Sequence, residues 1–271
     1  MAAGACVVLV IGAAAGILLM LSGTYDTAAT SQHFAITHRI LEHGLRYSVE
    51  AAAEDIVTPP LDEPGMIQRG AACYRQHCEQ CHGAPGIAPG AAAQGQQPVA
   101  TNLLQSAREW PPNQLYHVTK KGVRMTGMPA WEFRISESGL WSTVAFIKQL
   151  PDYSPDEYAA VAAATHSEPC PRASELTDAP SPEYAKIVLR QYACHSCHII
   201  EGLVGPQTHV GPPLVSWSRR KYIAGVLPNT PENLARWIRH PQQIRPGTLM
   251  PDLQVAESHA QVMASYLFTL D

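Results

Sequence analysis

Two segments of the chain share the five-residue pattern Cys-x-x-Cys-His, at residues 78–82 and 194–198. On a turn of helix, residues three and four positions apart lie on the same side of the backbone, so each segment presents two thiols and an imidazole together. A chain with two such segments has to build two surroundings that enclose whatever these side chains bind. This repetition constrains the fold more than any other feature of the sequence.

The pattern is the attachment signature of c-type haem. The two thiols add to the vinyl groups of a porphyrin and form thioethers, and the histidine supplies a nitrogen ligand to the iron. For a single copy, a zinc half-site or a redox-active cysteine pair would be the alternatives. Two copies, each followed by a Met-Pro pair, favour haem. We therefore predict two covalently bound haem c groups, with these attachment and ligand residues: Cys78, Cys81, His82, Cys194, Cys197 and His198.

The second axial ligands are predicted from the Met-Pro pairs. Met128 follows His82 by 46 residues, and Met250 follows His198 by 52 residues. The methionine thioether is a soft ligand that raises the reduction potential of haem iron, and the proline after it stiffens the loop that presents it. We predict Met128 and Met250 as ligands. Met125 is the alternative in the first half, and core packing is its other interpretation.

Several histidines outside the motifs are weaker candidates for iron ligation. His33, His38 and His43 are spaced by five residues, which does not stack them on one helical face; we expect them to be solvated or hydrogen-bonded. In the second half the alternatives to Met250 are three histidines, which we expect at the surface: His209, His240 and His259.

The N-terminus carries a long uncharged stretch. No charged residue occurs before Asp26, and the run from Cys6 to Leu21 is apolar. About 20 apolar residues span a bilayer, with a lower limit near 17. We expect a single retained membrane anchor over residues 1–25, and a secretory signal peptide is the alternative. In either case the rest of the chain is exported, which suits haem attachment in an oxidising compartment.

Helical periodicity and proline-rich breaks divide the remainder. Apolar residues at helical spacing predict helices over residues 33–55, 66–80, 137–149 and 256–270. Ser-Pro-Glu at 181–183 and Thr-Pro-Glu at 230–232 are typical helix starts. The expected domains are a juxtamembrane helix at 26–60, a first haem domain at 61–150, a Pro-rich linker at 151–180 and a second haem domain at 181–271.

The first domain resembles class I cytochrome c over its whole length. The resemblance rests on the order of an N-terminal helix, Cys-x-x-Cys-His, a loop, Met-Pro and an aromatic-bearing C-terminal helix. In that family the first and last helices cross beside the haem. The resemblance implies contacts at Gly70, Tyr74 and Trp141, and an all-α fold of two tandem class I cytochrome c domains behind an N-terminal transmembrane helix.

The second domain resembles the cytochrome c domain fused to subunit II of some haem-copper oxidases. The similar segments are residues 223–234, Trp237-Ile238 and Pro246–Pro251. The chain lacks that family's copper-binding segment, Cys-x-x-x-Cys. In class I cytochromes a Gly-Pro-x-Leu loop offers a backbone carbonyl to the haem histidine, so residues 211–214 imply that Pro212 or Pro213 fixes the tautomer of His198.

Three cysteines lie outside the motifs. Cys6 falls in the apolar N-terminus, Cys73 one helical turn before Cys78, and Cys170 in the Pro-rich linker. A disulfide between Cys73 and Cys170 is compatible with an oxidising compartment. The sequence does not predict it, and we expect unpaired thiols.

Charge excludes one class of partner. The net charge is −4, with 15% charged residues, which offers no basic surface for nucleic acid. Two small basic clusters are either docking sites for an acidic redox partner or solvated faces: Lys120, Lys121 and Arg124, and Arg219, Arg220 and Lys221.

These features predict a dihaem c-type cytochrome anchored in a bacterial inner membrane, with its haem domains in the periplasm. It relays single electrons in a respiratory chain and is not itself an enzyme. Its expected redox partner is a haem-copper terminal oxidase, and a dehydrogenase that uses the chain as its electron-accepting subunit is the alternative. A dihaem peroxidase needs an open or displaceable position on one iron, which the two Met-Pro loops disfavour.

Overall fold

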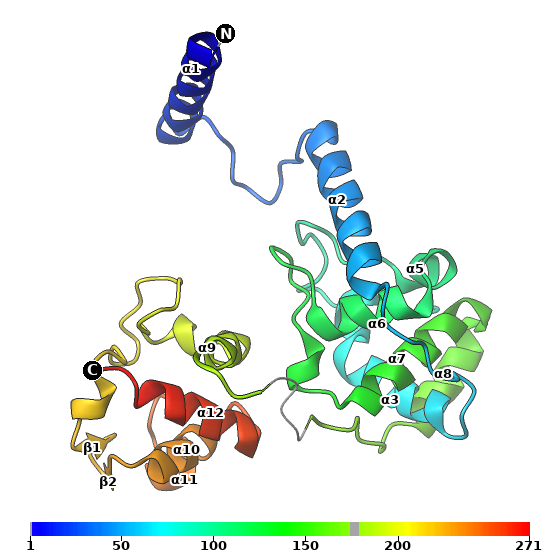
Figure 1. The fold of residues 1–271 in the computed structure, drawn as a ribbon. Helices are drawn as coiled ribbons and strands as arrows, with labels where there is room; N and C mark the ends of the chain where they lie inside the picture. Colours follow the sequence, from blue (N-terminus) through cyan, green and yellow to red (C-terminus); the bar gives the residue numbers. More distant parts are fainter. Residues whose placement is uncertain (1, 174–178) are drawn as a thin grey trace.

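The computed structural model of the chain describes residues 2–173 and 179–271, so part of the expected linker, 174–178, lies outside the described residues. Helices dominate, and apart from α1, which stands away from the others, they form two groups (Figure 1). Each group has its own hydrophobic core. The elements of the first half are α1 (Ala2–Leu21), α2 (Ala35–Ala53), α3 (Met66–His77), α4 (Glu79–His82), α5 (Leu103–Glu109), α6 (Pro112–Lys121), η1 (Trp131–Phe133), α7 (Glu137–Gln149), η2 (Leu150–Asp152) and α8 (Pro155–Ala164). Those of the second half are α9 (Pro182–Gln191), η3 (Cys194–Ser196), η4 (Trp217–Arg219), β1 (Tyr222–Ile223), β2 (Leu227–Pro228), α10 (Pro231–Arg239), α11 (Pro241–Ile244) and α12 (Glu257–Leu267).

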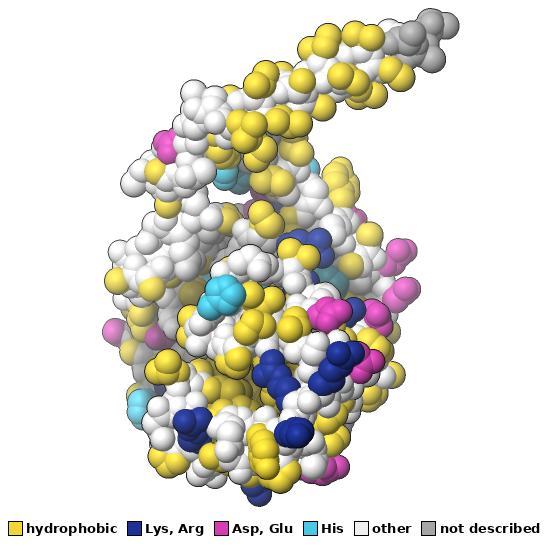
Figure 2. Space-filling view, turned by 90° about the vertical axis from the view of Figure 1, so that its left-hand side faces the viewer, with side chains coloured by type: hydrophobic (Ala, Val, Ile, Leu, Met, Phe, Trp, Pro, Cys, Tyr) yellow, Lys and Arg dark blue, Asp and Glu magenta, His cyan; other side chains and the backbone are white. Residues whose placement is uncertain are grey.

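The expected transmembrane helix is wrong. Within the part of the chain that the structure describes, no helix combines the length and the apolar character needed to cross a bilayer. The uninterrupted apolar run, Cys6 to Leu21, has 16 residues, which falls below the lower limit of about 17. Figure 2 shows the hydrophobic side chains of α1 exposed along a helix that stands away from the body.

The all-α expectation also needs one correction. Strands β1 and β2 pair antiparallel, with Ile223 opposite Leu227. Residues 224–226 connect them, and Ala224 and Gly225 are both at positive φ. The sequence did not predict this turn, because the segment has neither helical spacing nor the alternation typical of a strand.

The first core forms where α3 crosses α7, as the resemblance implied. Gly70 makes the crossing close, because a Cβ atom at this position would lie 2.0 Å from the carbonyl oxygen of Ser142. The Tyr74 ring packs at 5.5 Å from Phe146. Trp141 stacks instead on Tyr116 of α6, with ring centroids 4.0 Å apart. Helix α6 is thereby held against the same core.

Residues 151–173 run along the first core rather than away from it, and we call them the strap. Helix α8 packs on α3, with Tyr158 buried at 1% exposure. Arg75 donates to the carbonyl oxygens of Thr165 and His166 at 3.1 and 2.8 Å. The strap therefore covers the helix that leads into the first motif.

A disulfide closes the strap, against our expectation of unpaired thiols. Cys73 of α3 is bonded to Cys170, across a sequence separation of 97 residues. Both side chains are buried. This bond could be named from the sequence but not predicted, because it depends on the strap folding back onto α3.

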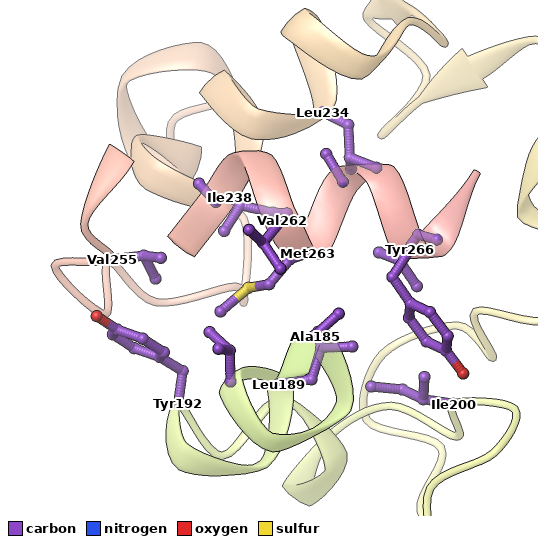
Figure 3. Packing of buried hydrophobic residues seen from close by; sticks show 14 of the residues in the cluster. Ala185, Leu189, Tyr192, Ile200, Leu234, Ile238, Val255, Val262, Met263 and Tyr266 are labelled. Atoms are coloured by element: carbon purple, nitrogen blue, oxygen red, sulfur yellow. The ribbon is translucent and has the colours of Figure 1, made fainter. Parts of the chain in front are cut away.

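The second core forms between α9, α10 and α12. Figure 3 shows Met263 of α12 between Leu189 of α9 and Ile238 of α10. The predicted helix starts are confirmed: the Ser181 hydroxyl accepts a hydrogen bond from the backbone of Tyr184, and Thr230 does the same for Asn233.

Candidate haem-binding sites

The first motif lies at the end of α3 and on the short helix α4. The backbone N–H of Cys78 still bonds to Tyr74, at 2.8 Å. The N–H groups of Cys81 and His82 then both donate to the carbonyl of Cys78, at 3.0 and 2.9 Å. This single turn brings the three motif side chains together, with Cys78 buried and the other two half-buried.

A loop carbonyl fixes the imidazole of His82. Nδ1 lies 2.6 Å from the carbonyl oxygen of Thr101, at the end of the Gly-, Pro- and Ala-rich loop. A histidine that donates Nδ1–H to a carbonyl has Nε2 left for a metal. Burial lowers the pKa of His82, so the ring is neutral at neutral pH. Sequence reasoning missed Thr101, because no local pattern marks a residue that acts through its backbone.

The second motif repeats this arrangement with a different support. The N–H groups of Cys197 and His198 donate to the carbonyl of Cys194, at 3.3 and 3.0 Å. Nδ1 of His198 lies 2.7 Å from the carbonyl oxygen of Pro212, which is the contact that the resemblance implied. A Cβ atom on Gly211 would lie 2.3 Å from Cε1 of the same ring, so only glycine fits there.

The four motif thiols are not bonded to one another. They remain free in a structure that does pair Cys73 with Cys170. Burial raises the pKa of Cys78 to about 12 and that of Cys194 to about 11. Redox-active cysteines and zinc ligands are thiolates favoured by a lowered pKa. The raised pKa values of Cys78 and Cys194 therefore disfavour both alternatives.

Both Met-Pro loops are held by a threonine two residues before the methionine. The hydroxyl of Thr126 accepts the backbone N–H of Met128 at 3.0 Å, and that of Thr248 accepts the N–H of Met250 at 3.3 Å. Sequence reasoning missed this shared Thr-x-Met-Pro pattern, although it is visible in the sequence. In the second loop, Gln242 adds hydrogen bonds to the carbonyls of Thr248 and Met250, at 2.7 and 2.9 Å.

The two candidate methionines of the first loop differ in burial. Met125 is 91% exposed and its φ is 63°, whereas Met128 is half-buried. Gly122 lets this loop approach α6, since a Cβ atom there would lie 2.7 Å from the carbonyl oxygen of Met128. In the second half, Met250 and Cys194 both pack against the second core.

One histidine alternative is not where the sequence placed it. We expected His259 at the surface, but its exposure is 0%. It lies on α12 and contacts Tyr184 and Tyr192. His209 is exposed and His240 half-buried. The error arose because a lone histidine on an apolar helix gives no signal for the hydroxyl partners that make its burial possible.

The donor sets at both motifs fit haem c. Each offers two thiols, an imidazole with its Nδ1 occupied, and a methionine in a braced loop. A buried donor, Nε1 of Trp217, has no hydrogen-bond acceptor among the described residues. The carboxylates of a porphyrin are acceptors of the kind that this indole lacks.

Comparison with known proteins found one family match, which covers the first site, and two curated relatives. Residues 65–147 match the family described as cytochrome C oxidase, cbb3-type, subunit III. The chain is 34% identical over 84 residues to cytochrome c oxidase subunit 2 of Alkalihalophilus pseudofirmus, covering 31% of the chain and 24% of that protein. It is 30% identical over 82 residues to the subunit 2 of a Bacillus species, strain PS3, covering 29% and 23%.

The chain thus spans about a quarter of the length of the curated relatives it matches. No solved structure matches it. The family match includes the first motif, its Met-Pro loop and the crossing of α3 with α7. Residues 65–147 therefore form a domain of the cytochrome c family, which implies covalently bound haem c.

Proposed function

We propose that the chain is a dihaem c-type cytochrome that relays single electrons in a respiratory chain to a haem-copper terminal oxidase. The observation that carries this proposal is the repetition of one construction: a Cys-x-x-Cys-His turn, a histidine bonded to a backbone carbonyl, and a Thr-x-Met-Pro loop. Residues 61–150 and 181–271 are the two proposed haem domains. The names of the relatives support the oxidase as acceptor.

In each proposed site, every residue has one role in holding the haem. Cys78 and Cys81 in the first site, and Cys194 and Cys197 in the second, tether the porphyrin. His82 and His198 would ligate the iron through Nε2, and Met128 and Met250 would each supply the second protein ligand. Haem c supplies reversible one-electron exchange between ferric and ferrous iron. With both positions filled there is no site for a substrate, so we propose electron transfer rather than catalysis.

Surface charge supports an acidic redox partner at the second half. Arg219 and Lys221 are exposed, and neither makes an ion pair within the described residues. In the first cluster, by contrast, Lys121 is paired with Glu132 at 2.9 Å. Figure 2 shows Lys and Arg side chains spread over the lower part of one face. Such a surface steers an acidic partner toward it.

The disulfide supports a location outside the cytoplasm. Disulfides persist in oxidising compartments such as the periplasm and are rare in the cytosol. Cys73 and Cys170 are bonded within the domain that carries the first motif. We therefore place the haem domains in the periplasm or an equivalent exported space.

The first test is the mass of the mature protein. Two haem adducts per chain are expected, and fewer than two would contradict the proposal. Ligand variants form the second test. Met128→Leu and Met250→Leu should each lower the potential of one haem and change its spectrum, because a soft thioether raises the potential. Met125→Leu is the matched control and should change neither.

Partner and reaction class need a separate measurement. The reduced protein should be reoxidised by an isolated haem-copper oxidase, with a rate that falls as salt is added, because screening weakens the steering of charged partners. Turnover of hydrogen peroxide by the purified protein would instead indicate a peroxidase. If the oxidase failed to reoxidise the protein, the proposed electron acceptor would be wrong, but the proposal of two haem groups would still stand.

A further inference from the structure

The segment that follows the Met128 loop enters the core of the second half. Ala130 and Phe133 both belong to the second hydrophobic core, and Phe133 is 2% exposed. Its ring centroid lies 6.3 Å from that of Tyr184 and 5.7 Å from that of His259. The neighbouring Trp131 faces the first half instead and packs at 5.0 Å from His77. This short segment therefore touches both cores.

Two hydrogen bonds join this segment to the residues just before the second motif. The hydroxyl of Tyr192 donates to the carbonyl of Phe133 at 3.2 Å. Nη2 of Arg134 donates to the carbonyl of Gln191 at 2.6 Å, and its guanidinium lies over the Tyr192 ring at 5.4 Å. Because Tyr192 precedes Cys194 by two residues, these bonds end next to the second motif.

His259 directs the Tyr192 hydroxyl. Its Nδ1 lies 3.1 Å from that hydroxyl, and its Nε2 lies 3.4 Å from the hydroxyl of Tyr184. Burial, followed by the charge of Arg134, lowers the pKa of His259, so the ring is neutral. A neutral ring that donates from Nδ1 and accepts at Nε2 leaves the Tyr192 proton for the carbonyl of Phe133. The Tyr192 hydroxyl and both nitrogens of the His259 ring then each have a hydrogen-bond partner, whereas the buried Nη1 of Arg134 has none among the described residues.

We propose that this junction, formed by Phe133, Arg134, Gln191, Tyr192 and His259, holds the two haem sites in a fixed relation and carries the electron between them. The inference rests on the proposed dihaem function. The route runs along the chain from Met128 to Phe133, five positions later, crosses the hydrogen bond to Tyr192, and reaches Cys194 two positions after that. Along the chain alone, Phe133 and Cys194 are separated by 61 residues.

The transfer needs no co-reactant. One electron leaves the reduced site and arrives at the oxidised one, and no bond or proton changes place. Electron tunnelling decays more steeply across an empty gap than across covalent or hydrogen bonds. Losing the hydroxyl of Tyr192 should therefore slow the transfer without altering either site.

The electronic test uses the full-length dihaem protein and the variant Tyr192→Phe. One haem is reduced by a light pulse and the interhaem rate is followed by absorbance. We expect a several-fold slower rate, with the haem count and both reduction potentials unchanged. Tyr266→Phe is the matched control, because it removes a tyrosine hydroxyl of the same half that donates to the carbonyl of Glu201, away from the route, and it should keep the original rate. An unchanged rate in Tyr192→Phe would overturn the route.

The structural test does not depend on electron transfer. Calorimetry of the full-length protein should give one unfolding transition, because the junction couples the two cores. Phe133→Ala should separate it into two transitions, and Phe133→Leu, which keeps an apolar side chain there, should restore one. A single transition in Phe133→Ala would overturn the rigid junction. A haem count below two would be seen first, by mass, and would refute the dihaem function itself.

Discussion

The two motif regions use the same ligand pattern but are stabilised in different ways. At the first, the strap is bonded to α3 through Cys73–Cys170, and Tyr158 donates to the carboxylate of Glu79 inside the motif. At the second, short loops and side chain–backbone hydrogen bonds provide the support, such as those from Gln242 to the Met250 loop. The second core in addition takes Phe133 from the first half.

The difference shows that the ligand pattern does not dictate its scaffold. The first site is enclosed by covalently closed chain, which stabilises it by limiting the unfolded ensemble. The second depends on packing across the junction and on polar contacts, so its stability is tied to the first half. Four changes test this contrast, and hydrogen exchange read separately in α3 and α12 distinguishes the two regions.

The largest effect is expected from removing the disulfide. Replacing both Cys73 and Cys170 by serine should destabilise the first region by about 4–5 kcal/mol, because the bond closes a loop of roughly 100 residues. Exchange should rise in α3 before α12. Cys6→Ser, at an exposed free thiol, is the control and should have no effect. Equal acceleration in both helices would show that the strap does not act on the first site selectively.

A smaller loss is expected from filling the helix crossing. Gly70→Ala places a methyl group 2.0 Å from the carbonyl oxygen of Ser142, so α3 and α7 must separate. Overpacking of this kind costs about 3 kcal/mol at its upper range. Gly44→Ala on α2, where nothing lies within 4 Å, should instead stabilise slightly. Thermal unfolding of both variants measures the contrast, and a tolerated Gly70→Ala would refute the tight crossing.

A smaller loss of stability is expected from removing the hydrogen bond between the strap and the first motif. Tyr158→Phe removes the hydroxyl that donates to Glu79 and should lower the free energy of unfolding by about 1.5 kcal/mol, the lower end of the range for hydrogen bonds to charged groups. Tyr153→Phe on the same strap removes a more exposed contact with Gln149 and is the control. Urea denaturation measures both. An equal loss in the two variants would mean that the Glu79 contact is not special.

The smallest effect concerns pH and the second core. The pKa of His259 is lowered from 6.5, so below that value the unfolded chain binds a proton that the folded protein does not. The contribution of His259 to the free energy of unfolding is therefore fully present above pH 6.5. It is lost as the pH falls below 6.5, by at most about 1.4 kcal/mol per pH unit. His259→Gln should reduce the acid sensitivity of exchange in α12. An unaltered pH profile would show that His259 does not titrate in this way.

The local elements were largely predictable because their causes are local. The helix at 137–149 has the bounds that periodicity indicated. Ser181 and Thr230 cap helices because a hydroxyl there accepts an N–H two or three residues away. The turn that gathers Cys78, Cys81 and His82 follows from the same short range. These features need no knowledge of the rest of the chain.

The sequence by itself determined the two motifs, the Met-Pro loops and most helix boundaries, since each is decided by residues a few positions apart. Only the tertiary structure decided that Cys73 meets Cys170, that Thr101 supplies the carbonyl for His82, and that Phe133 packs in the other core. It also decided that Pro212 rather than Pro213 supplies the carbonyl for His198. Such contacts depend on how the chain returns on itself, and backbone acceptors carry no side-chain signature. The expected membrane helix at the N-terminus was wrong. Its composition is apolar, but the uninterrupted apolar run is too short to cross a bilayer.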